Sequence, residues 1–150
     1  MTVDMIIRAK GREVETIRPE ATVTMAIQLF GAKGIGALVV TSDGEQVEGV
    51  LSERDVVQGL ARFGGDVLGM AVSELMSRPA PICAPNDSVK HVMATMTRTR
   101  HRHLPVVDGG RLAGIVSIGD VVKSRLEELE LETNVLRDAY LVHPLSARPA

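Results

Sequence analysis

The chain has 150 residues and a formal net charge of −2, and 45% of its residues are hydrophobic whereas only 2% are aromatic. This length accommodates one domain, or two small units that share an aliphatic core. A slightly acidic chain lacks the strong basic excess of a general polyanion-binding protein, so its composition argues against that class.

A single cysteine, Cys83, rules out an internal disulfide and a thiolate metal cluster, and it fits a reducing compartment. Its apolar surroundings indicate a small core residue. No apolar run approaches the roughly 20 residues of a membrane span, and charged residues interrupt any signal-peptide pattern at the start. We therefore expect a soluble, cytoplasmic protein that does not enter membranes.

The first half of the chain predicts the order strand, helix, strand, strand, helix from its apolar spacing and turn residues. Thr22 is placed to cap the first of these helices. The helix after Ser52 is expected to carry Val56, Val57 and Leu60 inward. The expected elements are a helical turn at 5–7, a strand at 14–17, a helix from 22, strands at 37–40 and 47–51, and a helix from 52.

The same order returns after a connection at 63–77, in which residues 72–76 are expected to form one helical turn. Ser88 is placed to cap the first helix of this half. The expected elements are a strand at 82–83, a helix from 88, strands at 103–107 and 112–116, and a helix that begins at 117 and continues well past 126.

The two halves repeat with a period near 66 residues. Pro85 follows Pro19 by 66 positions, Asp120 follows Asp55 by 65, and Val107 is aligned with Val40 at 67. Such a period predicts a duplicated unit, each copy being too small to be comfortable alone. The predicted organisation is a first repeat with the N-terminal segment at 1–62, the connection at 63–77, a second repeat at 78–130 and a C-terminal extension at 131–150.

One motif occurs in both halves, as GVLSERDVV at 49–57 and GIVSIGDVV at 114–122. Its apolar pair reads as the end of a buried strand, and its Ser-x-x-Asp as the opening of a helix. Backbone N–H groups and a hydroxyl at such a junction suit a phosphate, and the Asp can accept hydrogen bonds from ribose hydroxyls. The same four residues also describe a capping box with only a structural role.

This repeat, together with RHLPVVD at 102–108, resembles a pair of CBS domains, which are named for cystathionine β-synthase. The resemblance covers roughly residues 1–130 and is to the small stand-alone CBS-pair proteins of bacteria. It implies an α+β fold in which two tandem repeats pack sheet to sheet with pseudo-two-fold symmetry. Such pairs typically bind adenosine-containing nucleotides (AMP, ADP, ATP, NAD or S-adenosylmethionine) in clefts between the repeats, and they commonly dimerise.

By this resemblance the chain is expected to be a non-enzymatic regulatory module without a catalytic residue, catalytic cofactor or metal. It would bind an adenine nucleotide and signal to an unknown protein partner. The motif Ser would contact phosphate and the motif Asp would contact ribose. The short first strand of each repeat would contact adenine, and the basic residues would contact phosphate. The expected ligand-binding residues are Glu15, Thr16, Ile35, Gly36, Ala37, Ser52, Arg54 and Asp55, then Pro81, Ile82, Arg100, Arg102, His103, Ser117 and Asp120. Because Pro81 has no N–H to offer adenine, the two clefts are not expected to be fully equivalent.

Three other functions compete with this one. The basic run Arg98–His103 could contact nucleic acid, although interleaved aromatic residues are missing. His101 and His103 could share a strand face and ligate a metal, but no acidic or Cys partner completes the set. The chain could also be an interaction module whose clefts stay empty. We expect a homodimer, to which Leu126, Leu129, Val135 and Leu136 of the C-terminal stretch contribute.

Overall fold

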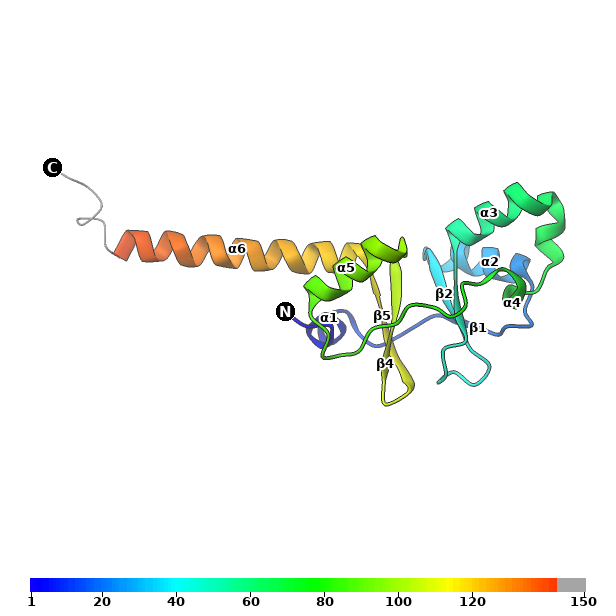
Figure 1. Ribbon diagram of the computed structural model, residues 1–150, viewed down its shortest axis with the longest axis horizontal. Coiled ribbons are helices and arrows are strands. Elements are labelled where there is room, and N and C mark those ends of the chain that lie inside the picture. The colour runs from blue at the N-terminus through cyan, green and yellow to red at the C-terminus, as the bar shows by residue number, and fades with distance from the viewer. Residues whose placement is uncertain (143–150) are drawn as a thin grey trace.

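Short strands and helices form two neighbouring units, and a long helix leaves the second unit, as Figure 1 shows. This computed structural model describes residues 1–142. The chain begins with α1 Val3–Lys10, and the first unit then contains β1 Thr16–Ile17, α2 Val23–Lys33, β2 Ala37–Val40, β3 Gly49–Ser52 and α3 Glu53–Phe63 in chain order. A 3-10 helix η1 Gly64–Gly69 and α4 Val72–Leu75 lead to α5 Val89–Thr99, β4 His103–Asp108, β5 Arg111–Ser117 and α6 Ile118–Val142.

Each unit has its own sheet. In the first, β1 lies parallel to β2 and β3 pairs antiparallel with β2, whereas the second consists of the antiparallel pair β4 and β5. The strand expected at residues 82–83 is reduced to one bridge between Cys83 and Val106. Pro81 and Pro85 flank this segment, and because proline has no N–H it cannot continue the ladder.

The strand register corrects one detail of the predicted repeat. Val40 pairs with Gly49, and Val106 pairs with Gly114. The counterpart of Val40 is therefore Val106, at an offset of 66, and the alignment with Val107 was wrong. The register shifts between Val106 and Val107, so the irregularity between the repeats begins inside the second hairpin and not before it.

Equivalent hydrogen bonds relate the two units. The N–H of Val3 donates to the carbonyl of Asp87 at 2.9 Å, and the N–H of Val72 donates to the carbonyl of Ala21 at 2.7 Å. Asp87 follows Ala21 by 66 positions, so α1 and α4 occupy matching places. The helix before each repeat thus packs on the other repeat, and α1 contacts β5 and α6. Residues 1–10, which the sequence grouped with the first repeat, belong with the second by packing.

The core consists of two aliphatic clusters. One joins α2, β2, β3, α3 and the connection around Leu38 and Leu51, and the other joins α1 to the second repeat around Leu104 and Val116. Val39 is also buried, although strand alternation points it away from Leu38. Both faces of the first sheet are thus covered, as the packing of two repeats sheet to sheet requires.

The inward face of α3 differs from the one predicted. Val56 is buried, but Val57 and Leu60 are 64% and 42% exposed. The helix instead turns Gly59 inward, where an added Cβ would lie 2.8 Å from side-chain atoms of both Leu75 and Val67. Close approach of the connection to a helix backbone without a side chain therefore sets the rotation of α3, and the apolar spacing alone did not reveal it.

Cys83 is a core residue, as its surroundings predicted. Its side chain is buried and lies 3.7 Å from the carbonyl oxygen of Pro105. Burial raises the pKa of its thiol to about 12. Because the thiolate is the reactive form, we expect native protein to react negligibly with a disulfide reagent at pH 8. Protein unfolded in guanidinium should release one equivalent at once, and rapid reaction of the folded chain would contradict this placement.

Within residues 1–142, no helix combines the length and apolar character needed to cross a bilayer.

Candidate functional site

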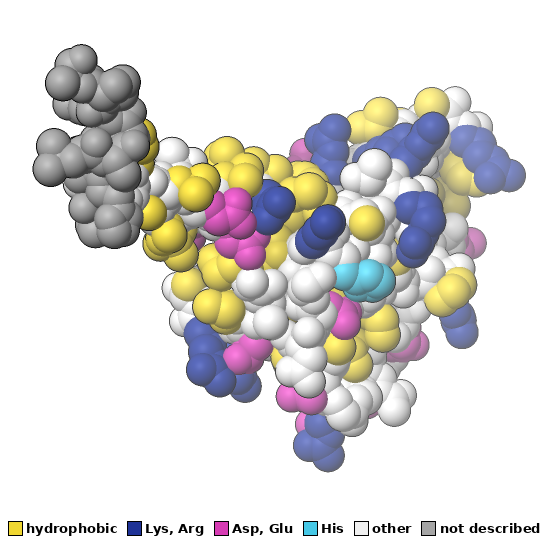
Figure 2. Space-filling model, turned by 60° about the vertical axis from the view of Figure 1, so that its left-hand side comes forward, with side chains coloured by type: hydrophobic (Ala, Val, Ile, Leu, Met, Phe, Trp, Pro, Cys, Tyr) yellow, Lys and Arg dark blue, Asp and Glu magenta, His cyan; other side chains and the backbone are white. Residues whose placement is uncertain are grey.

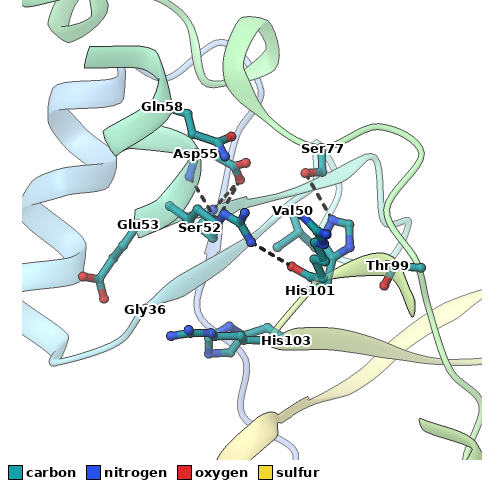
Figure 3. A pocket seen from close by; sticks show the side chains of 13 residues that line it. Gly36, Val50, Ser52, Glu53, Asp55, Gln58, Ser77, Thr99, His101 and His103 are labelled. Carbon is teal, nitrogen blue, oxygen red and sulfur yellow. Dashed lines mark hydrogen bonds between the residues drawn. The ribbon is translucent and has the colours of Figure 1, made fainter. Parts of the chain in front are cut away.

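A cavity of about 740 Å³ lies where the two repeats meet. The N-terminal turn of α3 forms one wall of the cavity, and the segment between α5 and β4 forms the other, as the close view in Figure 3 shows. The lining residues are Gly36, Val50, Ser52, Glu53, Arg54, Asp55, Gln58, Ser77, Thr99, Arg100, His101, Arg102 and His103. The cavity thus combines the motif of the first repeat with the basic run of the second.

Ser52 and Asp55 form a capping box at the start of α3. The Ser52 hydroxyl accepts from the N–H of Asp55 at 3.2 Å, and one Asp55 oxygen, Oδ2, accepts from the N–H and the hydroxyl of Ser52 at 2.8 and 3.0 Å. The prediction that this motif forms a capping box is therefore confirmed for Ser52 and Asp55. Among the described residues, no hydrogen bond reaches the other oxygen, Oδ1, of this cavity-lining carboxylate, which leaves an acceptor for a ligand.

Arg100 ends α5 in a conformation that is unusual for its residue type. Its φ and ψ are 58° and 34°, in the left-handed region, and no other described non-glycine residue has a positive φ. The equivalent residue of the first repeat, 66 positions earlier, is Gly34, with angles of 64° and 38°. An arginine thus occupies a position that favours glycine. Strain of this kind at a cavity wall suggests a functional requirement for the side chain.

Two further arginines line the cavity, one from each wall. Arg102 directly precedes β4 and lines the cavity with Arg100. From the opposite wall, Nη1 of Arg54 donates to the carbonyl oxygen of Arg100 at 3.4 Å. This contact ties the start of α3 to the end of α5, so the two repeats are linked across the cavity rim.

The two histidines of the basic run line the same cavity. Nε2 of His101 lies 3.4 Å from the Ser77 hydroxyl oxygen, and its buried Nδ1 has no hydrogen-bond partner within residues 1–142. Burial lowers the pKa of His103, as do Lys10 and Arg102, whereas Asp120 and Glu53 act in the opposite direction. These surroundings therefore favour the neutral form of His103. In the described part of the chain, no three His, Cys, Asp or Glu side chains are grouped to hold a metal ion.

The second motif forms a similar cap but has a different neighbour. Oδ2 of Asp120 accepts from the N–H of Ser117 at 2.9 Å, and Nζ of Lys10 lies 2.6 Å from the same oxygen. Burial alone would raise the pKa of Asp120, but hydrogen bonds from Lys10 and Ser117 outweigh it and lower that pKa. Because Lys10 comes from α1, the exchange of α1 between repeats places a cation on this carboxylate that Asp55 does not have.

The cavity brings together seven of the predicted site residues: Gly36, Ser52, Arg54, Asp55, Arg100, Arg102 and His103. The other eight, Glu15, Thr16, Ile35, Ala37, Pro81, Ile82, Ser117 and Asp120, do not line it. The carbonyl of Glu15 accepts from the N–H of Val39, so the first strand serves the sheet. Ser77, which was not predicted, lines the cavity beside Val50. It reaches this place because the segment before each repeat packs on the other repeat.

The sequence reading did not assign six cavity residues to a ligand: Val50, Glu53, Gln58, Ser77, Thr99 and His101. Glu53 and Val50 flank the motif serine, so their proximity to it could have identified them. His101 lies in the basic run and was considered only for nucleic-acid contact and as a metal ligand. No local signal identifies Ser77, since its place depends on the path of the connection.

A family model for the CBS domain matches residues 8–62 and 72–127. The chain belongs to the CBS-domain family. The crystal structure of the CBS-domain protein ATU1752 from Agrobacterium tumefaciens is 41% identical, with a TM-score of 0.79 over 83% of this chain and 92% of that one. The mitochondrial CBS domain-containing protein CBSX3 of Arabidopsis thaliana is 30% identical over 93% of this chain and 71% of its own length.

A more distant structure shares the fold. The CBS domain pair of protein MJ0100 is 22% identical, with a TM-score of 0.73 over 87% of this chain and 98% of that one. It was crystallised in complex with 5′-methylthioadenosine and S-adenosyl-L-methionine. By the family model, the chain is a CBS pair, a regulatory type of module, and its two matched segments follow the two repeats.

Proposed function

We propose that this CBS pair binds a phosphorylated adenine nucleotide (AMP, ADP, ATP or NAD) in the cavity between its repeats. The observation that carries the proposal is the convergence of Asp55 from one repeat with Arg100 and Arg102 from the other. A carboxylate accepts ribose hydroxyls, and arginine side chains donate to phosphate oxygens. One cavity therefore offers both kinds of group that a nucleotide requires.

Size and the family relation support the proposal. A volume of about 740 Å³ falls within the range of small-molecule sites, which is roughly 300–1,000 Å³. The related pair of MJ0100 holds two adenosine-containing ligands. For this chain, Asp55 would receive the ribose, the Ser52 hydroxyl and the arginines would face phosphate, and Ser77 would lie toward the base.

The position of the cavity suggests how binding would regulate. Its walls come from both repeats, so a ligand that contacts both walls stabilises one relative arrangement of the two. A ligand shifts such an equilibrium only by its difference in affinity between the arrangements. We infer that a protein partner reads this arrangement, and no catalytic step is needed for that role.

Titration calorimetry with adenosine, AMP, ADP, ATP and NAD tests the proposal directly. Mass spectrometry of ligand released from purified, heat-denatured protein identifies what the protein carries. In the calorimetry, Arg102→Ala should weaken ADP and ATP more than adenosine, since only the phosphorylated ligands use the guanidinium. Equal losses for adenosine and ATP would place Arg102 outside the phosphate site.

Binding should also depend on pH through His103. Its pKa is lowered in the free protein, and a nearby phosphate would raise it by favouring the protonated form. Binding then takes up a proton, so the affinity for ATP should rise as pH falls from about 8 toward 6, whereas adenosine should respond much less. His103→Gln should flatten this dependence, and an unchanged slope in that variant would assign the effect to another group.

Two of the competing functions, nucleic-acid binding and an interaction module with an empty cavity, predict different results. A nucleic-acid site would favour an exposed basic face, but here Arg100 and Arg102 line a cavity whose other wall carries Glu53 and Asp55. Figure 2 shows Lys and Arg side chains together with acidic ones on the face that it presents. An oligonucleotide that binds more tightly than ATP would favour the nucleic-acid function. Absence of binding to all five small ligands would favour an interaction module with an empty cavity.

A further inference from the structure

Helix α6 extends far beyond the repeat that it completes (Figure 1). Only its start is packed, with Val121 and Ser124 buried against the second unit. Beyond that point the helix carries large apolar side chains that no other part of residues 1–142 covers. In Figure 2, hydrophobic side chains gather where this helix leaves the body. A stretch of this kind needs a partner.

The uncovered side chains follow a heptad pattern. Along one face of α6 they recur at alternating intervals of four and three residues, which is the spacing of a coiled-coil seam. We call this face the heptad seam; its residues are Val122, Leu126, Leu129, Thr133, Leu136 and Tyr140. All six are exposed, and shallow hollows beside Leu126 and Leu129 flank the seam. The seam therefore has room to receive side chains from another helix.

Thr133 is compatible with an apolar seam. Its hydroxyl donates to the carbonyl oxygen of Leu129 at 2.9 Å, within the same helix. Burying it against a partner would therefore leave no unpaired donor. A β-branched residue at a position such as Thr133, followed by leucine at the next seam position, favours a two-stranded coiled coil. Residues 129–136 are thus compatible with a pair of helices.

The charges beside the seam select the partner and its direction. In a parallel pair of identical helices, the residue that precedes an a position of the heptad, here Leu126 or Thr133, faces the residue five places later on the other helix. Arg125 then faces Glu130 of the partner subunit, and Glu132 faces Arg137 of the partner subunit. Both pairs are attractive. We propose that α6 forms a parallel two-stranded coiled coil with α6 of a second copy of this chain.

The antiparallel alternative places like charges together. With Leu126 opposite Leu136 of the partner subunit, Glu130 would face Glu130 of the partner subunit. Lys123 would likewise face Arg137 of the partner subunit. Like-charge contacts of this kind disfavour an arrangement even where the apolar contacts are the same. The self-complementary charges also fit a second copy better than an unrelated helix.

The body of the protein does not block this contact. At 100° per residue, the centre of the seam lies roughly 130° around the helix from the face that Val121 and Ser124 bury. A second uncovered apolar pair, Leu131 and Val135, continues the buried face and is the rival docking surface. That face begins with Ser124 and includes Glu128, so it lacks a continuous apolar seam.

Two matched substitutions separate these surfaces. Leu136 on the seam and Leu131 on the rival face are 72% and 66% exposed, so neither change should disturb folding of the monomer, which melting curves can verify. Light scattering at micromolar concentration should give about 32 kDa for the parent, twice the 16.1 kDa of one chain. Leu136→Asp should raise the dissociation constant at least about tenfold, and Leu131→Asp should stay dimeric. A monomeric parent, or dissociation by Leu131→Asp alone, would overturn the proposal.

Crosslinking tests the direction. Native Cys83 is buried, so an introduced cysteine acts alone. Tyr140→Cys should oxidise to a covalent dimer in a parallel pair, where the two thiols meet. In an antiparallel pair they would lie roughly 27 Å apart, beyond disulfide reach. Leu131→Cys is the control that should not crosslink. Absence of a Tyr140→Cys dimer would refute the parallel arrangement.

Charge exchange supplies an independent test. Glu132→Arg should weaken the dimer, because it places two arginines together, and Glu132→Arg with Arg137→Glu should restore it. A double variant as weak as the single one would show that these residues do not meet. The proposal concerns assembly only, so it stands or fails separately from the nucleotide site.

Discussion

Asp55→Asn should weaken ADP and ATP binding by about ten- to a hundredfold, because a hydrogen bond to a charged group contributes roughly 1.5–3 kcal/mol. The substitution keeps the shape of the side chain and an oxygen that can accept from Ser52, whose N–H now donates to the carboxylate at 2.8 Å. Adenosine should lose a similar factor, since the ribose is common to all these ligands. Titration calorimetry measures both.

Asp120→Asn is the matched control. Asp120 caps α6 as Asp55 caps α3, with a hydrogen bond of 2.9 Å from the N–H of Ser117. It lies outside the cavity and already pairs with Lys10 at 2.6 Å. The control should therefore bind nucleotide like the parent, while melting curves of both variants report the cost to their caps. If Asp55→Asn also titrates like the parent, the Ser-x-x-Asp motifs are helix caps and nothing more.

Arg100→Gly should raise the free energy of unfolding and, at the same time, lower the affinity for ATP. A left-handed conformation costs a non-glycine residue about 1–2 kcal/mol, whereas glycine loses about 0.5–1 kcal/mol more conformational entropy on folding. We expect a net gain of about 0.5–1 kcal/mol, measured as a higher midpoint in urea unfolding. ATP binding should weaken more than adenosine binding, because Arg100 lines the wall that we propose to face phosphate.

Gly34→Arg is the reciprocal change in the first repeat. Gly34 has a φ of 64°, and an added Cβ would meet nothing within 4 Å, so the strain of the backbone would be the main cost. The variant should lose about 0.5–1 kcal/mol of stability and bind ATP normally, since Gly34 lies outside the cavity. A less stable Arg100→Gly variant would show that the side chain of Arg100 contributes packing that exceeds its backbone strain.

Much of the fold followed from local pattern. The duplication was visible in the spacing of Pro19 and Pro85. Thr22 and Ser88 cap the N-termini of α2 and α5, as expected. These features depend on neighbouring residues, because a cap or a strand-to-helix junction is decided within a few positions. The motif residues Ser52 and Asp55 were identified for the same reason.

The tertiary structure decided which of these local features meet. Each helix that precedes a repeat packs on the other repeat, which places Lys10 on Asp120 and the Ser77 segment beside Val50. No spacing along the chain records this exchange, because it results from the burial of apolar faces between distant segments. The sequence by itself therefore determined the two repeats, their caps and the basic run, whereas long-range packing determined that the basic run faces Asp55 and that the two motifs differ.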